Sequence, residues 1–334
     1  MHVLEAGEPG RPCVLLLHGF PELAYSWRKV MPALADAGYY VIAPDQRGYG
    51  QTTGWDVEDL AQYRMQNLVQ DAVSLLGDRK AHVVGHDFGS PVAAYAALFH
   101  PARFHSVVLM SAPFGGAPVG GRAGSIHEDL AKLGRKHYQW YFSSPEADAN
   151  MRRCPQGVHA FLRAYYHYKS ADWPGNRPFP LAGWTAPELA KLPAYYIMEL
   201  DKGMAETVAP HMPARAASWL TDAELSVYAE AFERNGFQGG LNWYRVATNP
   251  ALATSSAEKH IRIPALYIAG AADWGIYQKP GELERMQREV CTDFRGCHFV
   301  DGAGHWVQQE QAETTVALLL DFLNGVPAFA GTTS

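Results

Sequence analysis

Short apolar runs recur along the first third of the chain, and each ends at a polar or glycine-rich turn. They lie at residues 12–17, 39–43, 81–84 and 107–110. Runs that are apolar at every position predict strands buried on both faces, as in a parallel sheet covered by helices. Apolar positions at helical spacing over residues 60–76 predict one of these helices. The first part of the chain therefore predicts an α/β fold with a mostly parallel, doubly wound sheet.

The pattern changes near the end of the fourth run. A glycine- and proline-rich link from Gly115 to Gly124 leads into residues 125–250, which carry helical periodicity, many aromatic residues and no strand pattern. Thr221 and Glu224 have the spacing of a capping box and predict the start of a helix. We interpret this segment as an inserted helical cap.

Strand signals return after the cap. An apolar run at residues 263–268 predicts a further strand, a helix follows to about residue 288, and a last strand and helix are predicted near 299–300 and at 308–323. The predicted organisation is a sheet core in two parts with the cap between them, followed by a loose tail: residues 1–124, 125–250, 251–324 and 325–334.

The composition indicates a folded globular protein with a small, uncharged partner. The chain has 334 residues, of which 48% are hydrophobic, and a formal net charge of −6 without a basic stripe, which argues against nucleic acid as a partner. No apolar run approaches the ~18 residues of a membrane span, and the first residues lack the layout of a signal peptide. We therefore expect no membrane association, a cytoplasmic location, and either a monomer or a homodimer. The cysteines lack Cys-x-x-Cys spacing, so we expect reduced thiols, no metal site and no cofactor: Cys13, Cys154, Cys291 and Cys297.

The most informative stretch runs from Gly85 to Ser90 (Gly-His-Asp-Phe-Gly-Ser) and joins the run at 81–84 to a helix of small residues. A strand-turn-helix of this kind is a nucleophile elbow, and its reactive residue is usually serine. Here the residue is Asp87. A carboxylate that attacks an acyl carbon gives an unstable anhydride, whereas attack on a saturated carbon bearing a leaving group gives an ordinary alkyl ester. Asp87 is therefore a candidate nucleophile for opening epoxides or displacing halides.

Two further segments supply partners for this nucleophile. Asp273 follows the strand predicted at 263–268, and His305 follows the last predicted strand. Ligands of such sheets bind beyond the carboxyl ends of the strands, so these side chains should lie near Asp87. The order nucleophile, acid, histidine is that of α/β-hydrolases. We interpret Asp273 as the orienting acid and His305 as the general base.

A backbone oxyanion hole is predicted beside the elbow. Residues 18–22 (His-Gly-Phe-Pro-Glu) close the first long strand and can turn the N–H of Phe20 toward the elbow, while the N–H of Phe88 points in from the other side. Such a hole would first hold the carboxylate and then stabilise the tetrahedral intermediate formed when water attacks the ester. We interpret His18 and His86 as structural.

Together these motifs resemble the epoxide hydrolases of the α/β-hydrolase fold over nearly the whole chain. The resemblance is carried by residues 18–22, 25–28, 45–50, 85–90, 241–245 and 304–306. It implies that a small apolar epoxide and water are the substrates, and that a vicinal diol forms through a covalent ester on Asp87. It also implies two cap tyrosines that donate hydrogen bonds to the epoxide oxygen. One maps to Tyr244 and the other to Tyr141, with Tyr138 and the cluster Tyr165, Tyr166 and Tyr168 as alternatives.

Two other functions fit parts of this pattern. A haloalkane dehalogenase uses the same aspartate elbow but commonly holds the halide with a tryptophan next to the nucleophile, and Phe88 cannot donate that hydrogen bond. A non-hydrolytic ligand-binding member of the fold would keep the pocket and tolerate loss of a catalytic residue, whereas all three triad residues are present. Epoxide hydrolases often have tryptophan at the position of Phe88 as well, and its side chain is expected only to shape the pocket.

The predicted pocket is apolar and favours aryl or alkyl epoxides. We expect it to be lined by Pro21, Trp27, Trp243, Trp274 and Trp306. The chain begins in a predicted strand, which leaves open whether an outer strand of the usual sheet is missing.

Overall fold

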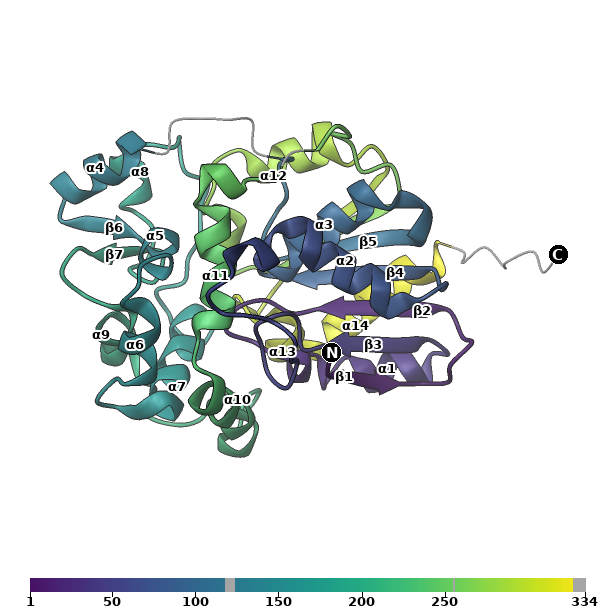
Figure 1. Cartoon of the computed structure of the whole chain (residues 1–334), viewed down its shortest axis with the longest axis horizontal. Coiled ribbons are helices and arrows are strands. Elements are labelled where there is room, and N and C mark those ends of the chain that lie inside the picture. The colour runs from purple at the N-terminus through teal and green to yellow at the C-terminus, as the bar shows by residue number, and fades with distance from the viewer. Residues whose placement is uncertain (118–123, 255, 327–334) are drawn as a thin grey trace.

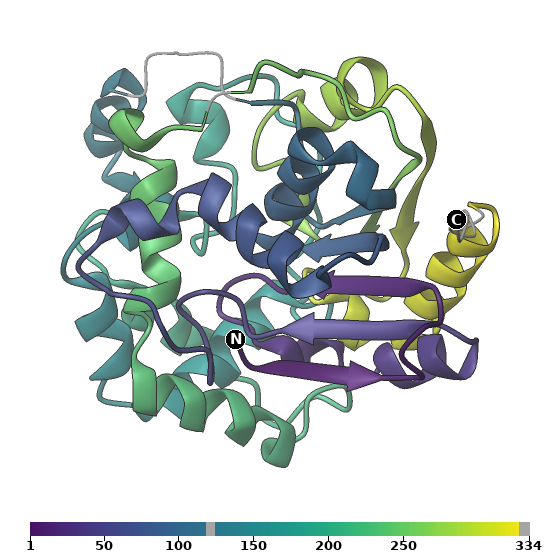
Figure 2. The same cartoon turned by 45° about the vertical axis from the view of Figure 1, so that its right-hand side comes forward.

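A computed structural model describes residues 1–117, 124–254 and 256–326 of the chain. Within these ranges the chain forms a seven-stranded sheet in the order β1-β3-β2-β4-β5-β8-β9, in which every neighbouring pair is parallel except β1 with β3. Strands β1, β3 and β2 lie side by side at one edge (Figure 2). The predicted α/β class is confirmed. The strands are Val3–Ala6 (β1), Cys13–Leu17 (β2), Tyr40–Pro44 (β3), Ala81–His86 (β4), Phe104–Met110 (β5), Ala265–Gly270 (β8) and Phe294–Val300 (β9).

Apolar side chains fill both faces of the sheet, as the unbroken runs predict. Alternate residues of β2 point to opposite faces, so that Leu15 and Leu17 join one apolar cluster while Val14 and Leu16 join the other. Helices cover each face and bury these clusters. The first face is covered by Met65–Leu76 (α2), Gly89–Phe99 (α3) and Glu282–Arg285 (α12) with a π-helical turn at Met286–Val290, and the second by Met31–Asp36 (α1) and Ala312–Asn324 (α14).

Two predicted helices are interrupted in the structure. The helix predicted at 60–76 is a 3₁₀ turn at Leu60–Tyr63 followed by α2, because Arg64 between them has an extended backbone with a ψ of 144°. The last predicted helix consists of Val307–Glu310 (α13) and α14, because Gln311 leaves the helical region with a φ of −132°. Apolar periodicity does not detect such breaks in a helix, since the apolar side chains before and after the break still face the core.

The segment between β5 and β8 forms a separate group of helices, on the left of Figure 1. We call residues 124–252 the cap. The prediction that the cap has no strand is wrong, because Arg135–His137 (β6) and Ile197–Glu199 (β7) form an antiparallel pair. Strands of three residues are too short to show the alternation from which strands are predicted. The cap helices are Gly124–Lys132 (α4), Tyr138–Phe142 (α5), Ala147–Arg152 (α6), Gly157–Lys169 (α7), Ala186–Leu189 (α8), Met204–Val208 (α9), Asp222–Asn235 (α10) and Gln238–Ala247 (α11).

The capping box predicted at Thr221 is confirmed. The Thr221 hydroxyl accepts a hydrogen bond from the Glu224 N–H, and the Glu224 carboxylate accepts one from the Thr221 N–H. These reciprocal bonds satisfy two N–H groups at the start of α10 that would otherwise lack acceptors.

The predicted domain limits stay predictions. Most of the link between core and cap (residues 118–123) and most of the predicted tail (residues 327–334) lie outside the described residues. In the ranges that are described, no helix is long and apolar enough to cross a bilayer.

Gly89 lies where α3 passes the end of β2, and this crossing leaves no room for a side chain. A Cβ atom on Gly89 would lie 2.2 Å from the carbonyl oxygen of Leu17. We expect Gly89→Ala to lower the free energy of unfolding by about 1–3 kcal/mol or more, because a backbone must shift. Urea unfolding followed by circular dichroism would measure the change. Gly183→Ala is the control, since a Cβ there has nothing within 4 Å, and equal unfolding midpoints for the two variants would contradict the prediction.

Candidate active site

Asp87, Asp273 and His305 come together at the carboxyl ends of parallel strands. Asp87 follows β4, Asp273 follows β8 and His305 follows β9. His305 Nε2 lies 3.0 Å from Asp87 Oδ2, and His305 Nδ1 lies 3.1 Å from Asp273 Oδ1. All three residues are buried, with 9% exposure or less. The structure thus places the three predicted side chains in one hydrogen-bonded line.

The turn that carries Asp87 is sharp. Asp87 has a φ of 52°, in the left-handed region that aspartate tolerates better than most residues. Its N–H donates to the carbonyl oxygen of Met110 at the end of β5, and its own carbonyl accepts from the Ser90 N–H. These bonds on both sides of the turn fix the direction in which the carboxylate projects.

The surroundings favour the ionised form of both aspartates. Burial opposes ionisation of Asp87, but its hydrogen bond with His305 and the charges of His305 and Lys169 outweigh burial and lower its pKa. Burial likewise opposes ionisation of Asp273, and interactions with His305, the Gly275 N–H and Lys169 lower its pKa. An ionised Asp87 is competent as a nucleophile, and an ionised Asp273 can orient the imidazole.

Lys169 places a positive charge beside this site, which the sequence motifs did not reveal. Lys169 ends α7 and is 3% exposed. Burial lowers the pKa of its ammonium, while the carboxylates of Asp87 and Asp273 act in the opposite direction. The cation therefore offsets part of the negative charge that the two aspartates bring into the interior. Its ammonium lies 5.1–5.8 Å from the ring centroids of Tyr165, Tyr195, Tyr196 and Trp306. The one sequence feature that could have pointed to Lys169 is its position directly after a segment rich in tyrosine.

His86, directly before Asp87, forms a buried ion pair with Glu22. His86 Nδ1 lies 2.6 Å from Glu22 Oε2, and His86 Nε2 lies 2.7 Å from the carbonyl oxygen of His305. Both neighbours are acceptors, so both ring nitrogens donate and the imidazole is positively charged. Burial alone would lower the pKa of His86, but Glu22 outweighs it and raises that pKa. Through His86 this pair is hydrogen-bonded to residues 301–306, which carry His305 and which we call the histidine loop, in agreement with a structural role for His86.

Of the two predicted oxyanion donors, one contacts the carboxylate. The Phe20 N–H donates to Asp87 Oδ1 at 2.9 Å. Phe88 is the N-cap residue of α3, and within the described residues its N–H makes no hydrogen bond to that oxygen. A Cβ on Gly19 would lie 2.4 Å from Asp87 Oδ1. Glycine at this position therefore lets the end of β2 approach the carboxylate.

Tyr244 lies beside the elbow, and Tyr138 lies next to Tyr244. The ring of Tyr244, on α11, packs against those of Phe20 and Phe88 at centroid distances of 5.5 and 5.0 Å. The ring of Tyr138, on α5, lies 6.0 Å from that of Tyr244. Burial raises the pKa of both tyrosines, and the charge of Asp87 raises it further. Both phenols are thus within electrostatic reach of the candidate nucleophile.

The structure does not bring Tyr141 to this site, which contradicts its prediction as the second tyrosine. The Lys136 ammonium lies 4.7 Å from the Tyr141 ring centroid, and the charges that act on its phenol are those of Glu206 and Glu146. The sequence does not distinguish between two tyrosines, Tyr138 and Tyr141, that lie close together in one short segment. The orientation of the short helix α5 decides which of them faces the core.

The three clustered tyrosines of α7 have separate surroundings. The Tyr166 hydroxyl donates to the carbonyl oxygen of Pro21, and the ring of Tyr168 stacks on His211. Burial raises the pKa of Tyr165, and the charges of Asp87 and Tyr138 raise it further. Tyr165 is therefore the member of this cluster that, like Tyr138 on α5, lies near the triad.

Two of the predicted pocket residues, Trp306 and Trp243, have rings close to those of His305 and Phe88, and their role in binding stays a prediction. The Trp306 ring lies 4.7 Å from that of His305, and the Trp243 ring lies 5.2 Å from that of Phe88. Trp274 directly follows Asp273 and is buried. The carbonyl oxygen of Pro21, next to Phe20, accepts a hydrogen bond from the Tyr166 hydroxyl of the cap.

Trp27 does not line the pocket, and its prediction as a substrate-binding residue is wrong. It is fully buried in the apolar cluster on the opposite face of the sheet, which is covered by α1 and α14. The 3₁₀ turn at Ala24–Trp27 places its side chain there. Trp27 is close in sequence to the motif at residues 18–22, and this proximity gave no sign that its side chain lies on the other face of the sheet.

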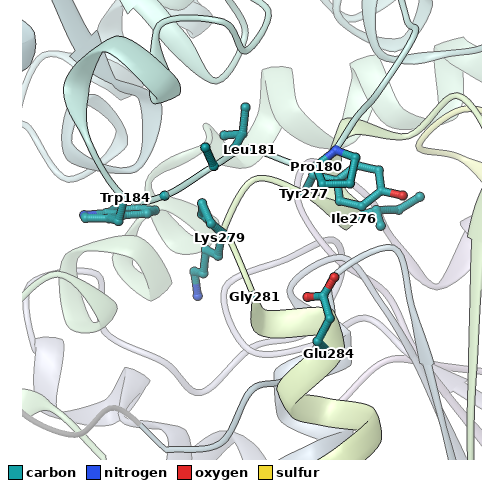
Figure 3. Close-up of a pocket in the computed structure, with 11 residues that line it drawn as sticks. Pro180, Leu181, Trp184, Ile276, Tyr277, Lys279, Gly281 and Glu284 are labelled. Atoms are coloured by element: carbon teal, nitrogen blue, oxygen red, sulfur yellow. The ribbon is translucent and has the colours of Figure 1, made fainter.

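A separate pocket of about 400 Å³ opens between a cap loop and the segment after β8 (Figure 3). It is lined by residues 180–184 of the cap and by residues between Ile276 and Glu284. These lining residues do not include the triad. Converging ionisable groups with shifted pKa values mark the candidate site more strongly than an open pocket does.

Comparison with known proteins identifies the family. A profile of the α/β hydrolase fold matches residues 12–312. Epoxide hydrolase A of Mycobacterium tuberculosis (strain ATCC 25618 / H37Rv) is 37% identical, over 98% of this chain and 94% of that protein. This chain belongs to the epoxide hydrolase family. Epoxide hydrolase B of the same strain is 36% identical, over 94% of this chain and 92% of that protein.

Solved structures of epoxide hydrolases superpose on this chain. The crystal structure of epoxide hydrolase A from Mycobacterium thermoresistibile has a TM-score of 0.77 and 36% sequence identity. The superposition covers 97% of this chain and 95% of that chain. An epoxide hydrolase from an endophytic Streptomyces has a TM-score of 0.78 and 35% identity, over 97% of this chain and 92% of that chain. The resemblance predicted from the sequence is confirmed.

Proposed function

We propose that this protein hydrolyses small apolar epoxides to vicinal diols through a covalent ester on Asp87. The observation that carries the proposal is the pair of contacts on the Asp87 carboxylate. The Phe20 N–H holds Oδ1, and His305 Nε2 contacts Oδ2. This arrangement provides a fixed nucleophile together with a base for the ester that it would form. The names of the relatives support the same reaction.

Ring opening is the first step. A carboxylate oxygen of Asp87 attacks an epoxide carbon, the bond from that carbon to the ring oxygen breaks, and the electron pair stays on the oxygen. Tyr244 and Tyr138 donate hydrogen bonds to this oxygen, and one of them transfers its proton, since a phenol is acidic enough to protonate an alkoxide. The carboxylate becomes a neutral ester, which removes a charge that raises the pKa of both tyrosines. The phenols therefore become better donors as the ring opens.

Tyr138 is the second donor in this proposal. Its hydroxyl donates to Gln278 Oε1 at 3.0 Å and accepts from Gln139 Nε2 at 3.1 Å. A phenol has a single hydrogen to donate, and rotation about its C–O bond would redirect that hydrogen from Gln278 to the epoxide oxygen.

Ester hydrolysis is the second step. His305 takes a proton from water, Asp273 stabilises the imidazolium, and the hydroxide attacks the carbonyl carbon of the ester. The Phe20 N–H stabilises the tetrahedral oxyanion. Collapse breaks the bond to the diol oxygen, which takes the proton from His305. The proton of the new Asp87 carboxyl group returns to the phenolate, so the enzyme is regenerated.

Haloalkane dehalogenation has less support, because neither Trp243 nor Trp306 offers a free indole N–H to a halide. The indole N–H groups of Trp243 and Trp306 donate to the backbone carbonyls of Arg47 and Tyr166. Both indole N–H groups are therefore used in hydrogen bonds within the protein. Phe88, next to the proposed nucleophile, has no N–H group in its side chain. A binding protein without catalysis has no need of the connected line from Asp87 to Asp273.

Turnover of styrene oxide and of 1-bromobutane distinguishes these functions. We expect diol formation from styrene oxide and no release of bromide, because the proposed donors to an epoxide oxygen, Tyr138 and Tyr244, lie within electrostatic reach of Asp87. Asp87→Asn should form no diol, since it lacks the attacking carboxylate. Bromide release without diol formation would replace the proposal with dehalogenation, and binding without either reaction would favour a binding protein.

A further inference from the structure

Glu310 accepts hydrogen bonds from the backbone on both sides of His305. It is the last residue of α13 and is partly buried. Its Oε2 accepts from the Gly304 N–H at 2.9 Å, and its Oε1 accepts from the Trp306 N–H at 2.9 Å. One carboxylate thus holds the two residues between which His305 lies.

The same carboxylate ties this loop to the cap. Glu310 Oε2 also accepts from the Ala171 N–H, just after α7, at 2.8 Å. The His305 N–H donates to the carbonyl oxygen of Lys169, at the end of α7, at 2.9 Å. A Cβ on Gly304 would lie 2.6 Å from that oxygen, so the two backbones are in direct contact. Three consecutive N–H groups of the histidine loop therefore have fixed acceptors at its junction with the cap.

An ionised carboxylate suits this arrangement best. All three partners of Glu310 are donors, and a carboxylate offers two oxygens without hydrogens. Desolvation raises the pKa of Glu310 to about 8, although hydrogen bonds from the three N–H groups lower it, and the negative charge of Asp172 also raises it. The ionised carboxylate that fits these three N–H donors therefore predominates only above about pH 8.

We propose that Glu310 is a positioning residue for His305. By holding Gly304 and Trp306 it fixes the backbone from which the imidazole projects, and by holding Ala171 it couples that backbone to the docked cap. The inference rests on the proposed function, in which His305 activates the water that hydrolyses the ester. Loss of the carboxylate should therefore slow ester hydrolysis more than ester formation.

Single-turnover kinetics of Glu310→Gln test this role. Glutamine keeps the size of the side chain but presents an NH₂ group to at least one N–H donor. At a pH above the pKa of Glu310, we expect ester formation from styrene oxide at close to the wild-type rate. Ester hydrolysis should be slower by on the order of 10- to 100-fold, the effect of a small misplacement of a catalytic group. Stopped-flow tryptophan fluorescence gives both rate constants, and mass spectrometry of quenched samples should show accumulated ester.

Two further variants make the test decisive. Glu313→Gln makes the same change in charge at an exposed position of α14 and should leave both steps unchanged. Glu310→Asp keeps the charge but withdraws the carboxylate by one methylene; it should also slow hydrolysis selectively, and it replaces Glu310→Gln if that variant does not fold. Wild-type hydrolysis, or equal slowing of both steps, would overturn the positioning role. Absence of diol formation by the wild-type protein would instead overturn the proposed function.

Discussion

Replacing His305 with glutamine should trap the protein as a covalent ester on Asp87. Glutamine cannot take a proton from water, so the rate of diol formation should fall by roughly 10²- to 10⁴-fold. Ester formation should continue, because the charge of Lys169 and the Phe20 N–H still favour the ionised carboxylate. Intact-mass spectrometry after addition of styrene oxide should show the mass of the protein plus one substrate.

Two further variants serve as comparisons for His305→Gln. Asp87→Asn has no carboxylate to alkylate and should keep its unmodified mass under the same conditions. Asp273→Asn should accumulate less ester than His305→Gln, because the imidazole remains but loses a carboxylate whose oxygens lie 3.1 and 3.3 Å from Nδ1. An unmodified mass in folded His305→Gln protein that still binds substrate would refute the covalent mechanism.

The second large effect is expected from the cap tyrosines. Tyr138→Phe combined with Tyr244→Phe should nearly abolish ester formation, because both donors to the epoxide oxygen are lost while the rings keep their packing. Each single variant should slow alkylation by roughly 10²-fold or more, the scale of one positioned acid. A preformed ester should still be hydrolysed at close to the normal rate. Stopped-flow fluorescence separates the two steps.

Tyr141→Phe is the matched control for this pair. It makes the same change on the same helix, at a ring that contacts Lys136 and not the triad, and should leave alkylation unchanged. Slowing by Tyr165→Phe in place of Tyr138→Phe would move the second donor to α7. If no cap tyrosine affects alkylation, epoxide opening loses its support and dehalogenation or binding gains it.

Much of the fold could be predicted because its signals are local. Unbroken apolar runs identified β2, β3, β4, β5 and β8, since a strand buried on both faces needs apolar residues at every position. The elbow at Asp87 was recognisable because the strand, the turn and the helix are adjacent in sequence. The positions of Asp273 and His305 followed from one rule, that parallel strands direct their carboxyl ends to one edge of the sheet.

The errors about site residues arose where the orientation of a side chain mattered more than its position in the sequence. Trp27 lies next to a motif but is buried on the opposite face of the sheet. Tyr141 and Tyr138 are three residues apart on α5, and only Tyr138 packs near Tyr244. Side chains of one residue type in one segment carry no signal of the direction in which a helix docks.

The sequence by itself determined the α/β architecture, the kind of candidate nucleophile and the chain order of the candidate triad, because each depends on residues adjacent along the chain or on a rule of sheet topology. The tertiary structure decided which charges surround Asp87 and which tyrosines lie near it. Glu22 pairs with His86 across 64 positions, and Glu310 reaches Ala171 across 139. Such contacts form only when separate elements pack together, and they leave no periodic pattern along the chain.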